Sequence, residues 1–309
     1  MPWSTVELND GTPLPNIAYG TWRLEEPIQK VSDALSVGFR HIDTAQAYRN
    51  ETETGKAIKQ SGIPRSELFI TTKYTSRDGL DVETAIWNSL ERLGLAYVDL
   101  YLIHNVRHAI PDIPTCWKRM EKVKADGLAK NIGVSNFQLE HLQQLESAQI
   151  KPVVNQIMFH LYLREGLKPT LDYCAKNGIV VEGYSPMIPL IHVPIGKEAA
   201  IKVASSHSVG PEQVLLAWSR AKGVIPVTSS SKKDRMEAYR AAGNLELTAK
   251  ISRNSMQLGP KALPHGRRSG MITSPQRRVD ALIINIQART LCVLCTIGIC
   301  PIDKPSETA

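Results

Sequence analysis

Residues 39–60 read FRHIDTAQAYRNETETGKAIKQ. The first six of them are rich in β-forming apolar residues and end beside a carboxylate, Asp43, whereas residues 51–60 have helical character. The same strand-then-helix unit recurs along the chain as far as about residue 242. A series of such units predicts parallel strands with helices packed on their outer side.

Eight segments have the character of strands: 16–21, 39–44, 68–73, 98–104, 129–135, 152–159, 179–185 and 223–229. Nine segments have the apolar spacing of helices: 26–37, 51–60, 81–93, 114–126, 138–147, 165–177, 196–206, 211–222 and 232–242. Asp81 and Ser231 are suitable N-caps for two of these helices, and Gly94 is a suitable end for one. Eight strands, each followed by a helix, predict an α/β fold, a (β/α)8 TIM barrel, with one extra helix before the last strand.

A doubly wound sheet is the structural alternative. That fold usually carries a glycine-rich GxGxxG loop after its first strand, but here the first strand leads into GTWRLEEP. Residues 4–15, STVELNDGTPLP, predict an N-terminal β-hairpin that turns at Asp10-Gly11 and could cap the bottom of a barrel. The barrel is therefore the favoured fold.

Composition narrows the classes of partner. The chain has 309 residues, 42% of them hydrophobic, yet no apolar run approaches the roughly 18 residues of a membrane span. The start lacks the pattern of a secretory signal. The five cysteines, with Cys116 and Cys174 scattered, do not look like a disulfide framework, so a reducing cytoplasm is expected. The net charge of +7 is concentrated in residues 250–309, which hold nine Lys or Arg against three Asp or Glu, leaving 28 against 27 elsewhere. The body of the protein therefore gives no reason to expect a nucleic-acid partner.

Polar residues stand where the predicted strands end, and in a barrel these ends meet at one rim. Asp43, Lys73 and His104 end the second, third and fourth strands, and Tyr48 lies in the loop after the second. A Lys73 ammonium would stabilise a phenolate and so lower the pKa of Tyr48, while Asp43 would hold Lys73 charged. A neutral His104 could donate a hydrogen bond to a substrate oxygen. This set suits protonation of a carbonyl oxygen while a hydride reaches the carbon.

From about residue 5 to residue 248 the chain resembles the aldo-keto reductase family. The resemblance rests on HIDTAQAY, ITTK and DLYLIH, which place the family's tetrad on Asp43, Tyr48, Lys73 and His104. By implication Tyr48 is the general acid, Lys73 and Asp43 tune it, and His104 orients the carbonyl. The reaction implied is NADPH-dependent reduction of an aldehyde or ketone, a small-molecule carbonyl substrate, by an enzyme that is often a monomer.

The resemblance also implies a nicotinamide cofactor across the barrel mouth. Gly20 and Thr21 match contacts of the first loop, Ser135, Asn136 and Gln156 match those to the carboxamide, and Tyr184 would stack on the nicotinamide ring. The other residues expected to bind the cofactor are Asp43, Ser185, Pro186, Thr228, Ser229, Lys232 and Arg235. Hydroxyls, helix N–H groups and cations in SSSKKDR favour NADP over NAD. Trp22 and Asn105 are expected to line the substrate pocket, and no metal is expected.

The chain departs from the family at three places. Ala238-Tyr239 replaces the usual Glu-Asn of the adenosine site, and Asn105-Val106 replaces the Trp-Pro that commonly follows the histidine. With Asn105-Val106 and the loop TSSSKK at residues 228–233, the chain is more similar to fungal keto-ester and ketolactone reductases of the family than to aldose reductases. After a barrel spanning residues 1–248, residues 249–309 are rich in Gly, Pro, Ser and Arg and are predicted to form a divergent, poorly ordered basic tail.

Three alternatives to a reductase stay open at this point. Lys73 could form a Schiff base in an aldolase, in which case the amine rather than the ammonium would be needed. The barrel could instead bind the cofactor without catalysis and act as a redox sensor. The basic tail could also bind nucleic acid.

Overall fold

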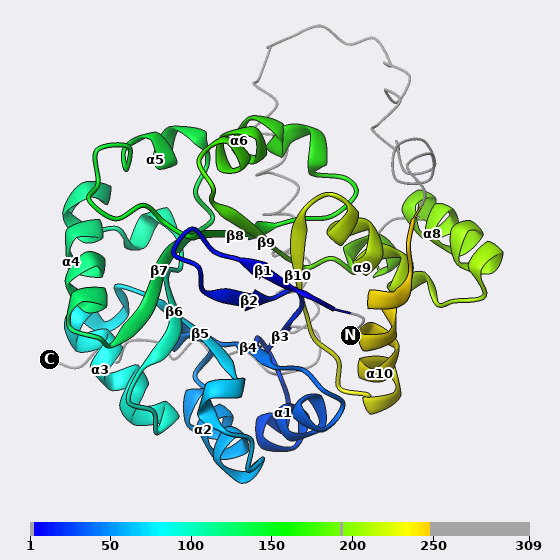
Figure 1. Ribbon diagram of the computed structural model, residues 1–309, viewed down its shortest axis with the longest axis horizontal. Helices are drawn as coiled ribbons and strands as arrows, with labels where there is room; N and C mark the ends of the chain where they lie inside the picture. The colour runs from blue at the N-terminus through cyan, green and yellow to red at the C-terminus, as the bar shows by residue number, and fades with distance from the viewer. Residues whose placement is uncertain (1–2, 192–193, 248–309) are drawn as a thin grey trace, which may run out of the picture. The chain divides into compact units, whose positions relative to one another are not determined.

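The computed structural model describes residues 3–191 and 194–247, and its centre is a closed barrel of eight parallel strands (Figure 1). The order around the barrel is β10-β3-β4-β5-β6-β7-β8-β9. The strands are β3 (Ala18–Gly20), β4 (His41–Asp43), β5 (Phe69–Tyr74), β6 (Val98–Ile103), β7 (Ala129–Ser135), β8 (Val154–Met158), β9 (Val180–Tyr184) and β10 (Val224–Thr228). Each predicted strand is present, with ends that agree to within two residues, and the barrel fold is confirmed. The predicted tail, residues 249–309, lies outside the described residues.

Helices surround the barrel, as Figure 1 shows. They are α1 (Pro27–Ser36), α2 (Glu51–Gln60), α3 (Val82–Leu93), α4 (Ile113–Ala125), α5 (Leu139–Gln143), α6 (Arg164–Lys176), α7 (Ile188–Ile191), α8 (Pro194–His207), α9 (Pro211–Ala221) and α10 (Lys233–Ala241). Short 3₁₀ turns are η1 (Gln46–Tyr48), η2 (Arg65–Glu67), η3 (Arg77–Gly79), η4 (Val106–His108) and η5 (Ala242–Asn244). Three helices, the short α7 and the longer α8 and α9, lie between β9 and β10, so the extra helix predicted before the last strand is present.

Three helical details differ from the predictions. α5 ends at Gln143 rather than near residue 147, because the following amides bond to carbonyls three residues back, as Leu145 does to Leu142. α7 was not predicted, since four residues are too few to show a period. Ser231 is not the N-cap of α10, because Lys232 occupies that position. Asp81 does cap α3, and its side chain accepts from Thr84 N at 2.8 Å.

The hairpin predicted at the N-terminus consists of β1 (Thr5–Glu7) and β2 (Pro13–Pro15), with Val6 opposite Leu14. It lies across one end of the barrel in Figure 1. Leu8 and Leu14 pack there on an apolar cluster in the barrel floor, which includes Phe69, Leu100, Leu102, Val154 and Ile225. Phe69 and Val154 begin their strands, so the hairpin closes the N-terminal end of the barrel. The opposite, C-terminal end stays open, and in barrels of this kind that end carries the functional residues.

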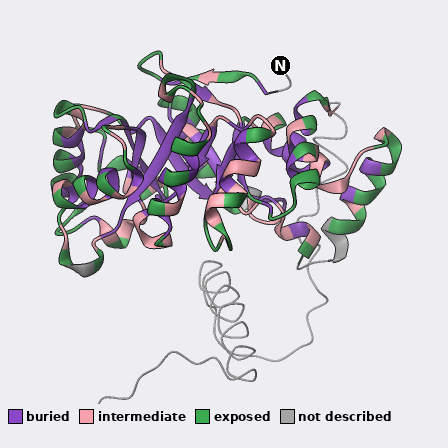
Figure 2. Cartoon of the chain, turned by 90° about the horizontal axis from the view of Figure 1, so that it is seen from below, coloured by how far each residue is buried: buried purple, intermediate pink, exposed green. Residues whose placement is uncertain are grey.

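A second and larger core fills the space between the strands and the surrounding helices. Figure 2 shows buried residues on the strands and on the inward faces of the helices, with exposed residues on the outside. Trp117, Phe137 and Phe159 are among its fully buried side chains. Within residues 3–191 and 194–247, no helix is long and apolar enough to cross a membrane. The two cores fix the strands in register and thereby the side chains at their C-terminal ends.

Candidate active site

A buried ion pair between Asp43 and Lys73 lies at the C-terminal end of the barrel. Asp43 ends β4, and its neighbour in register on β5 is Thr71, so Lys73 stands one inward position further along. Lys73 Nζ donates to Asp43 Oδ1 at 2.6 Å and to the carbonyl of Thr44 at 2.8 Å, with both charged side chains nearly inaccessible. Burial by itself lowers the pKa of Lys73, but Asp43 and then Tyr48 outweigh it and raise the pKa overall. Lys73 therefore stays an ammonium.

Tyr48 ends η1 and lies beside this pair. Its hydroxyl is 3.5 Å from Lys73 Nζ, and its ring meets that of His104 edge to face at 5.5 Å between centroids. Burial raises the pKa of Tyr48, and the charge of Lys73 opposes this without overcoming it. The predicted lowering of the Tyr48 pKa is therefore wrong as a net effect. Spacing along a sequence contains no measure of burial, and here burial is the larger contribution.

His104 directly follows β6, and its amide donates to the carbonyl of Tyr74 at 3.0 Å. Burial first, and then the charge of Lys73, lower its pKa to about 3, so the ring is neutral, as the sequence predicts. Its Nδ1 has no hydrogen-bond partner among the described residues. A neutral imidazole next to a phenol is suited to orient a carbonyl oxygen.

Ser135, Asn136 and Tyr184 come together on the side of the mouth formed by β7 and β9. Asn136 Nδ2 donates to the carbonyl of His104 at 3.0 Å and to Ser135 Oγ at 3.1 Å, while its Oδ1 accepts from Tyr184 OH at 2.8 Å. Asn136 has a left-handed backbone, with φ of +61°. These bonds hold the three predicted nicotinamide contacts as one unit beside His104.

Gln156 on β8 connects this side to the ion pair. Its Nε2 donates to Asp43 Oδ2 at 2.8 Å, whereas its Oε1 accepts no hydrogen bond from a described residue. An acceptor without a partner beside a Ser–Asn pair fits a carboxamide, which brings its own N–H groups. The residues present therefore fit a nicotinamide. Across the mouth, Thr21 follows Gly20 and its hydroxyl donates to Thr44 Oγ1 at 2.9 Å, so it is fixed by the protein itself.

The predicted phosphate site lies where β10 passes into α10. Thr228 is buried, whereas Ser229, Lys232 and Arg235 are exposed. Lys232 is the N-cap of α10 and has no side-chain cap, so helix N–H groups and cations meet there. Such a donor set suits a phosphate. Ser185, with φ of +60°, and the buried Pro186 follow β9 at the same end of the barrel.

The two predicted substrate-pocket residues lie in loops at the C-terminal end. Trp22 is 56% exposed, and Arg23 Cζ lies 4.5 Å from its ring centroid. Asn105 is half-buried and uses its side chain locally, because Oδ1 accepts from Arg107 N at 3.1 Å at the start of η4. Trp22 offers the larger free surface for contact with a bound molecule.

Comparison with known proteins identifies the relatives of this fold and site. The Aldo/keto reductase family matches residues 14–188, which include all four residues of the predicted tetrad. The chain belongs to the aldo-keto reductase family. Membership confirms the resemblance that the sequence motifs indicate.

Two curated relatives of this aldo-keto reductase illustrate the range of the family. The NAD/NADP-dependent indole-3-acetaldehyde reductase of Schizosaccharomyces pombe is 41% identical over 68% of this chain and 76% of its own. The glyoxal reductase of Bacillus subtilis is 39% identical over 75% of this chain and 84% of its own.

Solved structures agree with the fold. A Brucella melitensis aldo/keto reductase has a TM-score of 0.74 and 33% identity, covering 82% of this chain and 98% of its own. A Bombyx mori aldo-keto reductase in complex with NADP has a TM-score of 0.75 and 30% identity, covering 82% of this chain and 92% of its own.

One buried residue of this aldo-keto reductase was not singled out from the sequence. Glu182 on β9 is fully buried, and its Oε2 accepts from Gln156 Nε2 at 2.8 Å. The signal was present in IVVEGYS, where a carboxylate interrupts an otherwise apolar strand. The role of this carboxylate depends on which residues of β4 and β8 it faces. Those neighbours are known only once the barrel is closed.

Proposed function

We propose that this aldo-keto reductase reduces an aldehyde or ketone to an alcohol with NADPH, with Tyr48 as the general acid. The observation that carries the proposal is the position of Lys73, which lies 2.6 Å from Asp43 and 3.5 Å from the Tyr48 hydroxyl. A neutral His104 lies against the same tyrosine ring. A proton donor, a fixed cation and an orienting imidazole are what carbonyl reduction requires of a protein.

Each member of the tetrad has a distinct role. When bound, NADPH would supply the hydride that the carbonyl carbon receives. Tyr48 donates a hydrogen bond to the carbonyl oxygen and transfers its proton there, so that hydride and proton together give the alcohol. The phenolate left on Tyr48 is stabilised by the ammonium of Lys73, which Asp43 keeps charged. His104 donates its N–H to the same oxygen and sets its direction.

Residues of the mouth hold the cofactor in this proposal. Ser135, Asn136 and Gln156 bind the carboxamide, and Tyr184 packs on the nicotinamide ring. Gly20, Thr21, Ser185 and Pro186 line the mouth, while Thr228, Ser229, Lys232 and Arg235 bind the 2′-phosphate. The presence of cations at the start of α10 supports NADPH. The Bombyx mori structure, whose title names NADP, supports it as well.

The test is Tyr48→Phe, assayed by NADPH oxidation with an aromatic aldehyde, glyoxal, a 2-keto ester and a ketolactone. Removing the acid costs about 100-fold or more in kcat. NADPH binding, followed by fluorescence, persists because the hydroxyl does not hold the cofactor. Unchanged turnover in Tyr48→Phe would overturn the role of Tyr48.

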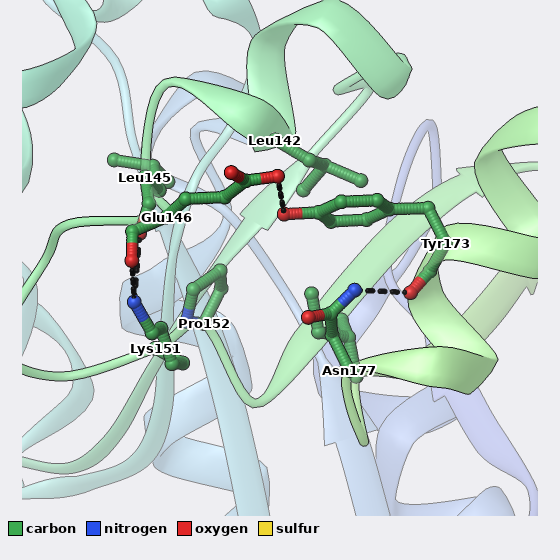
Figure 3. A pocket seen from close by; sticks show the side chains of 8 residues that line it. Leu142, Leu145, Glu146, Lys151, Pro152, Tyr173 and Asn177 are labelled. Atoms are coloured by element: carbon green, nitrogen blue, oxygen red, sulfur yellow. Dashed lines mark hydrogen bonds between the residues drawn. The ribbon is translucent and has the colours of Figure 1, made fainter.

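Tyr173→Phe is the matched control, since it removes the same atom elsewhere. Tyr173 borders a small pocket between α5 and α6, where its hydroxyl donates to Glu146 Oε1 at 3.1 Å (Figure 3). The change leaves turnover and NADPH binding at wild-type levels.

The same assays separate the competing functions. Cofactor binding without turnover of any carbonyl would favour a redox sensor. A Schiff-base aldolase needs a neutral amine, whereas the raised pKa of Lys73 keeps it protonated. Borohydride with substrate is expected to leave Lys73 unmodified, and trapped substrate would contradict the reductase mechanism.

We further propose that the protein acts as a cytoplasmic monomer with no nucleic-acid partner. Support comes from the charge of residues 1–249, where 28 Lys or Arg stand against 27 Asp or Glu. The large exposed apolar side chains among the described residues include Trp22 in the loop after β3, Trp87 on α3 and Ile201 on α8, so they belong to different parts of the barrel. Light scattering of the full chain, together with DNA and RNA titrations at low salt, tests this proposal.

A further inference from the structure

A second carboxylate lies buried beneath the catalytic ion pair. Glu182 projects from β9 into the barrel and is inaccessible to solvent. Gln156 Nε2 donates to Glu182 Oε2 and to Asp43 Oδ2, at 2.8 Å in each case. One amide nitrogen therefore joins the two carboxylates and uses both of its hydrogens to do so.

The other oxygen of Glu182 lacks a hydrogen bond. Glu182 Oε1 has no such partner among the described residues and lies 3.9 Å from His41 Nε2. His41 Nε2 is itself paired with Thr71 Oγ1 at 2.8 Å. An ionised oxygen in such a place is costly, because it is buried away from bulk solvent and no described residue donates a hydrogen bond to it.

The groups around Glu182 explain how this cost is avoided. Asp43 and His41 face it from β4, Lys73 from β5, and Gln156 from β8, while its register neighbour on β10 is the apolar Ile225. Burial first, and then the charge of Asp43, raise the pKa of Glu182 to about 8, although Gln156 and Lys73 oppose the rise. Burial lowers the pKa of His41 to about 3, so His41 is neutral. Glu182 is therefore mostly protonated at neutral pH.

We propose that Glu182 is a positioning residue for carbonyl reduction. It holds the Gln156 amide between the cofactor and Asp43. Its charge also sets how well Asp43 and Lys73 together stabilise a phenolate on Tyr48. This inference rests on the proposed function. While Glu182 is neutral, the described charged groups that act on it are the carboxylate of Asp43 and the ammonium of Lys73. Loss of the Glu182 proton adds a second negative charge beside Asp43.

That added charge has a defined effect on the acid. It disfavours a phenolate on Tyr48 and so raises the pKa of Tyr48 further. Because Tyr48 must release its proton during reduction, kcat falls as the pH rises through about 8, by roughly threefold to tenfold. Tyr48 itself stays protonated across this range, since its own pKa is already raised.

Glu182→Gln tests the charge and keeps the hydrogen bond, because a glutamine oxygen can still accept from Gln156. At saturating NADPH and substrate, the variant keeps kcat at pH 7 within about threefold and loses the decline near pH 8. Glu182→Leu removes the acceptor as well, so the Gln156 amide can turn. It weakens NADPH binding by about tenfold and lowers kcat, and Glu182→Gln restores both.

Glu51→Gln is the matched control. Glu51 is likewise a buried carboxylate, 1% exposed, but it pairs with Arg92 and Thr72 outside the barrel. The Glu51→Gln variant keeps the wild-type pH profile of kcat and the wild-type dissociation constant of NADPH. A pH profile of Glu182→Gln with the same decline and midpoint as the wild type overturns the proposal.

Infrared difference spectra of the wild-type chain between about pH 6 and about pH 9 give a readout that needs neither turnover nor a folded variant. A protonated carboxyl stretch that disappears near pH 8 supports the proposal, and its absence at pH 6 overturns it. If the wild type reduces no carbonyl in the panel, the proposed function fails, while the infrared and NADPH-binding results still decide whether Glu182 titrates and holds Gln156.

Discussion

Glu51 and Glu182 are buried to almost the same extent, at 1% and 0% exposed, but in different layers of the molecule. Glu51 lies between the strands and the helices, where Thr72 Oγ1 donates to it at 2.6 Å and Arg92 Nε at 2.8 Å. Glu182 lies inside the barrel, where one oxygen accepts from Gln156 and the other has no described hydrogen-bond partner. Equal burial therefore does not imply an equal role. Paired donors make Glu51 a structural link, whereas burial and the charge of Asp43 raise the pKa of Glu182.

Lys73 is the cation of the ion pair inside the barrel, and Lys73→Met removes it. Asp43 then stays buried without its counter-charge, and a phenolate on Tyr48 loses its stabilisation. We expect kcat to fall by at least about 100-fold and the free energy of unfolding to fall by about 3–5 kcal/mol. NADPH oxidation and urea unfolding measure the two effects.

Lys130→Met serves as the control for that change. Lys130 pairs with Asp99 at 3.3 Å through a side chain that is about half exposed, away from the tetrad. The Lys130→Met variant should retain the wild-type kcat. Retention of activity by Lys73→Met would remove the interior ion pair from the mechanism.

The pH dependence of stability tests the raised pKa of Glu182 directly. The pKa of Glu182 rises from an ordinary 4.5 to about 8 on folding, so above pH 4.5 the unfolded chain releases this proton first. Its contribution to stability is complete below pH 4.5 and is lost as the pH rises through about 8. We expect Glu182→Gln to gain up to about 3 kcal/mol relative to the wild type between about pH 5 and about pH 8.

Urea unfolding of both proteins across that range measures the gain. His41 and His104, whose pKa values fall to about 3, act in the opposite direction below pH 6.5. Because both proteins contain these histidines, their effect cancels in the difference. Parallel stability curves for the two proteins would contradict the raised pKa of Glu182.

Glu51→Gln is expected to have the smallest effect. It weakens the bond to Arg92, whose side chain is 38% exposed, and keeps an acceptor for Thr72. The free energy of unfolding should fall by about 2 kcal/mol, with kcat unchanged, as measured by urea unfolding and NADPH oxidation. A large loss of kcat with normal stability would show that the two layers are coupled.

Local patterns were sufficient for most of the fold. Alternating strand and helix segments predicted all eight barrel strands, because each strand is an apolar run bounded by turn residues. The prediction of α5 extended too far, since residues 144–148 close into tighter turns with hydrogen bonds between residues three apart. The Ser231 cap was wrong for a similar reason. Choices between neighbouring residues at a helix end depend on backbone angles, which a residue pattern does not contain.

In the candidate site, too, the sequence predicted one part and missed another. Asp43, Tyr48, Lys73 and His104 were predicted to meet, and the structure brings them together. Their catalytic roles remain proposals. The sequence did not indicate that burial would raise the pKa of Tyr48 despite Lys73, since burial depends on every element around the ring.

By itself, the sequence determined the barrel, the family and the identity of the polar residues at the strand ends, because each of these is written in a contiguous motif. Only the tertiary structure decided which side chains share a hydrogen bond across the barrel. Gln156 joins Asp43 to Glu182 although the three lie on β8, β4 and β9. Such contacts arise from strand register and barrel closure, and the burial that closure imposes sets the charge of each group.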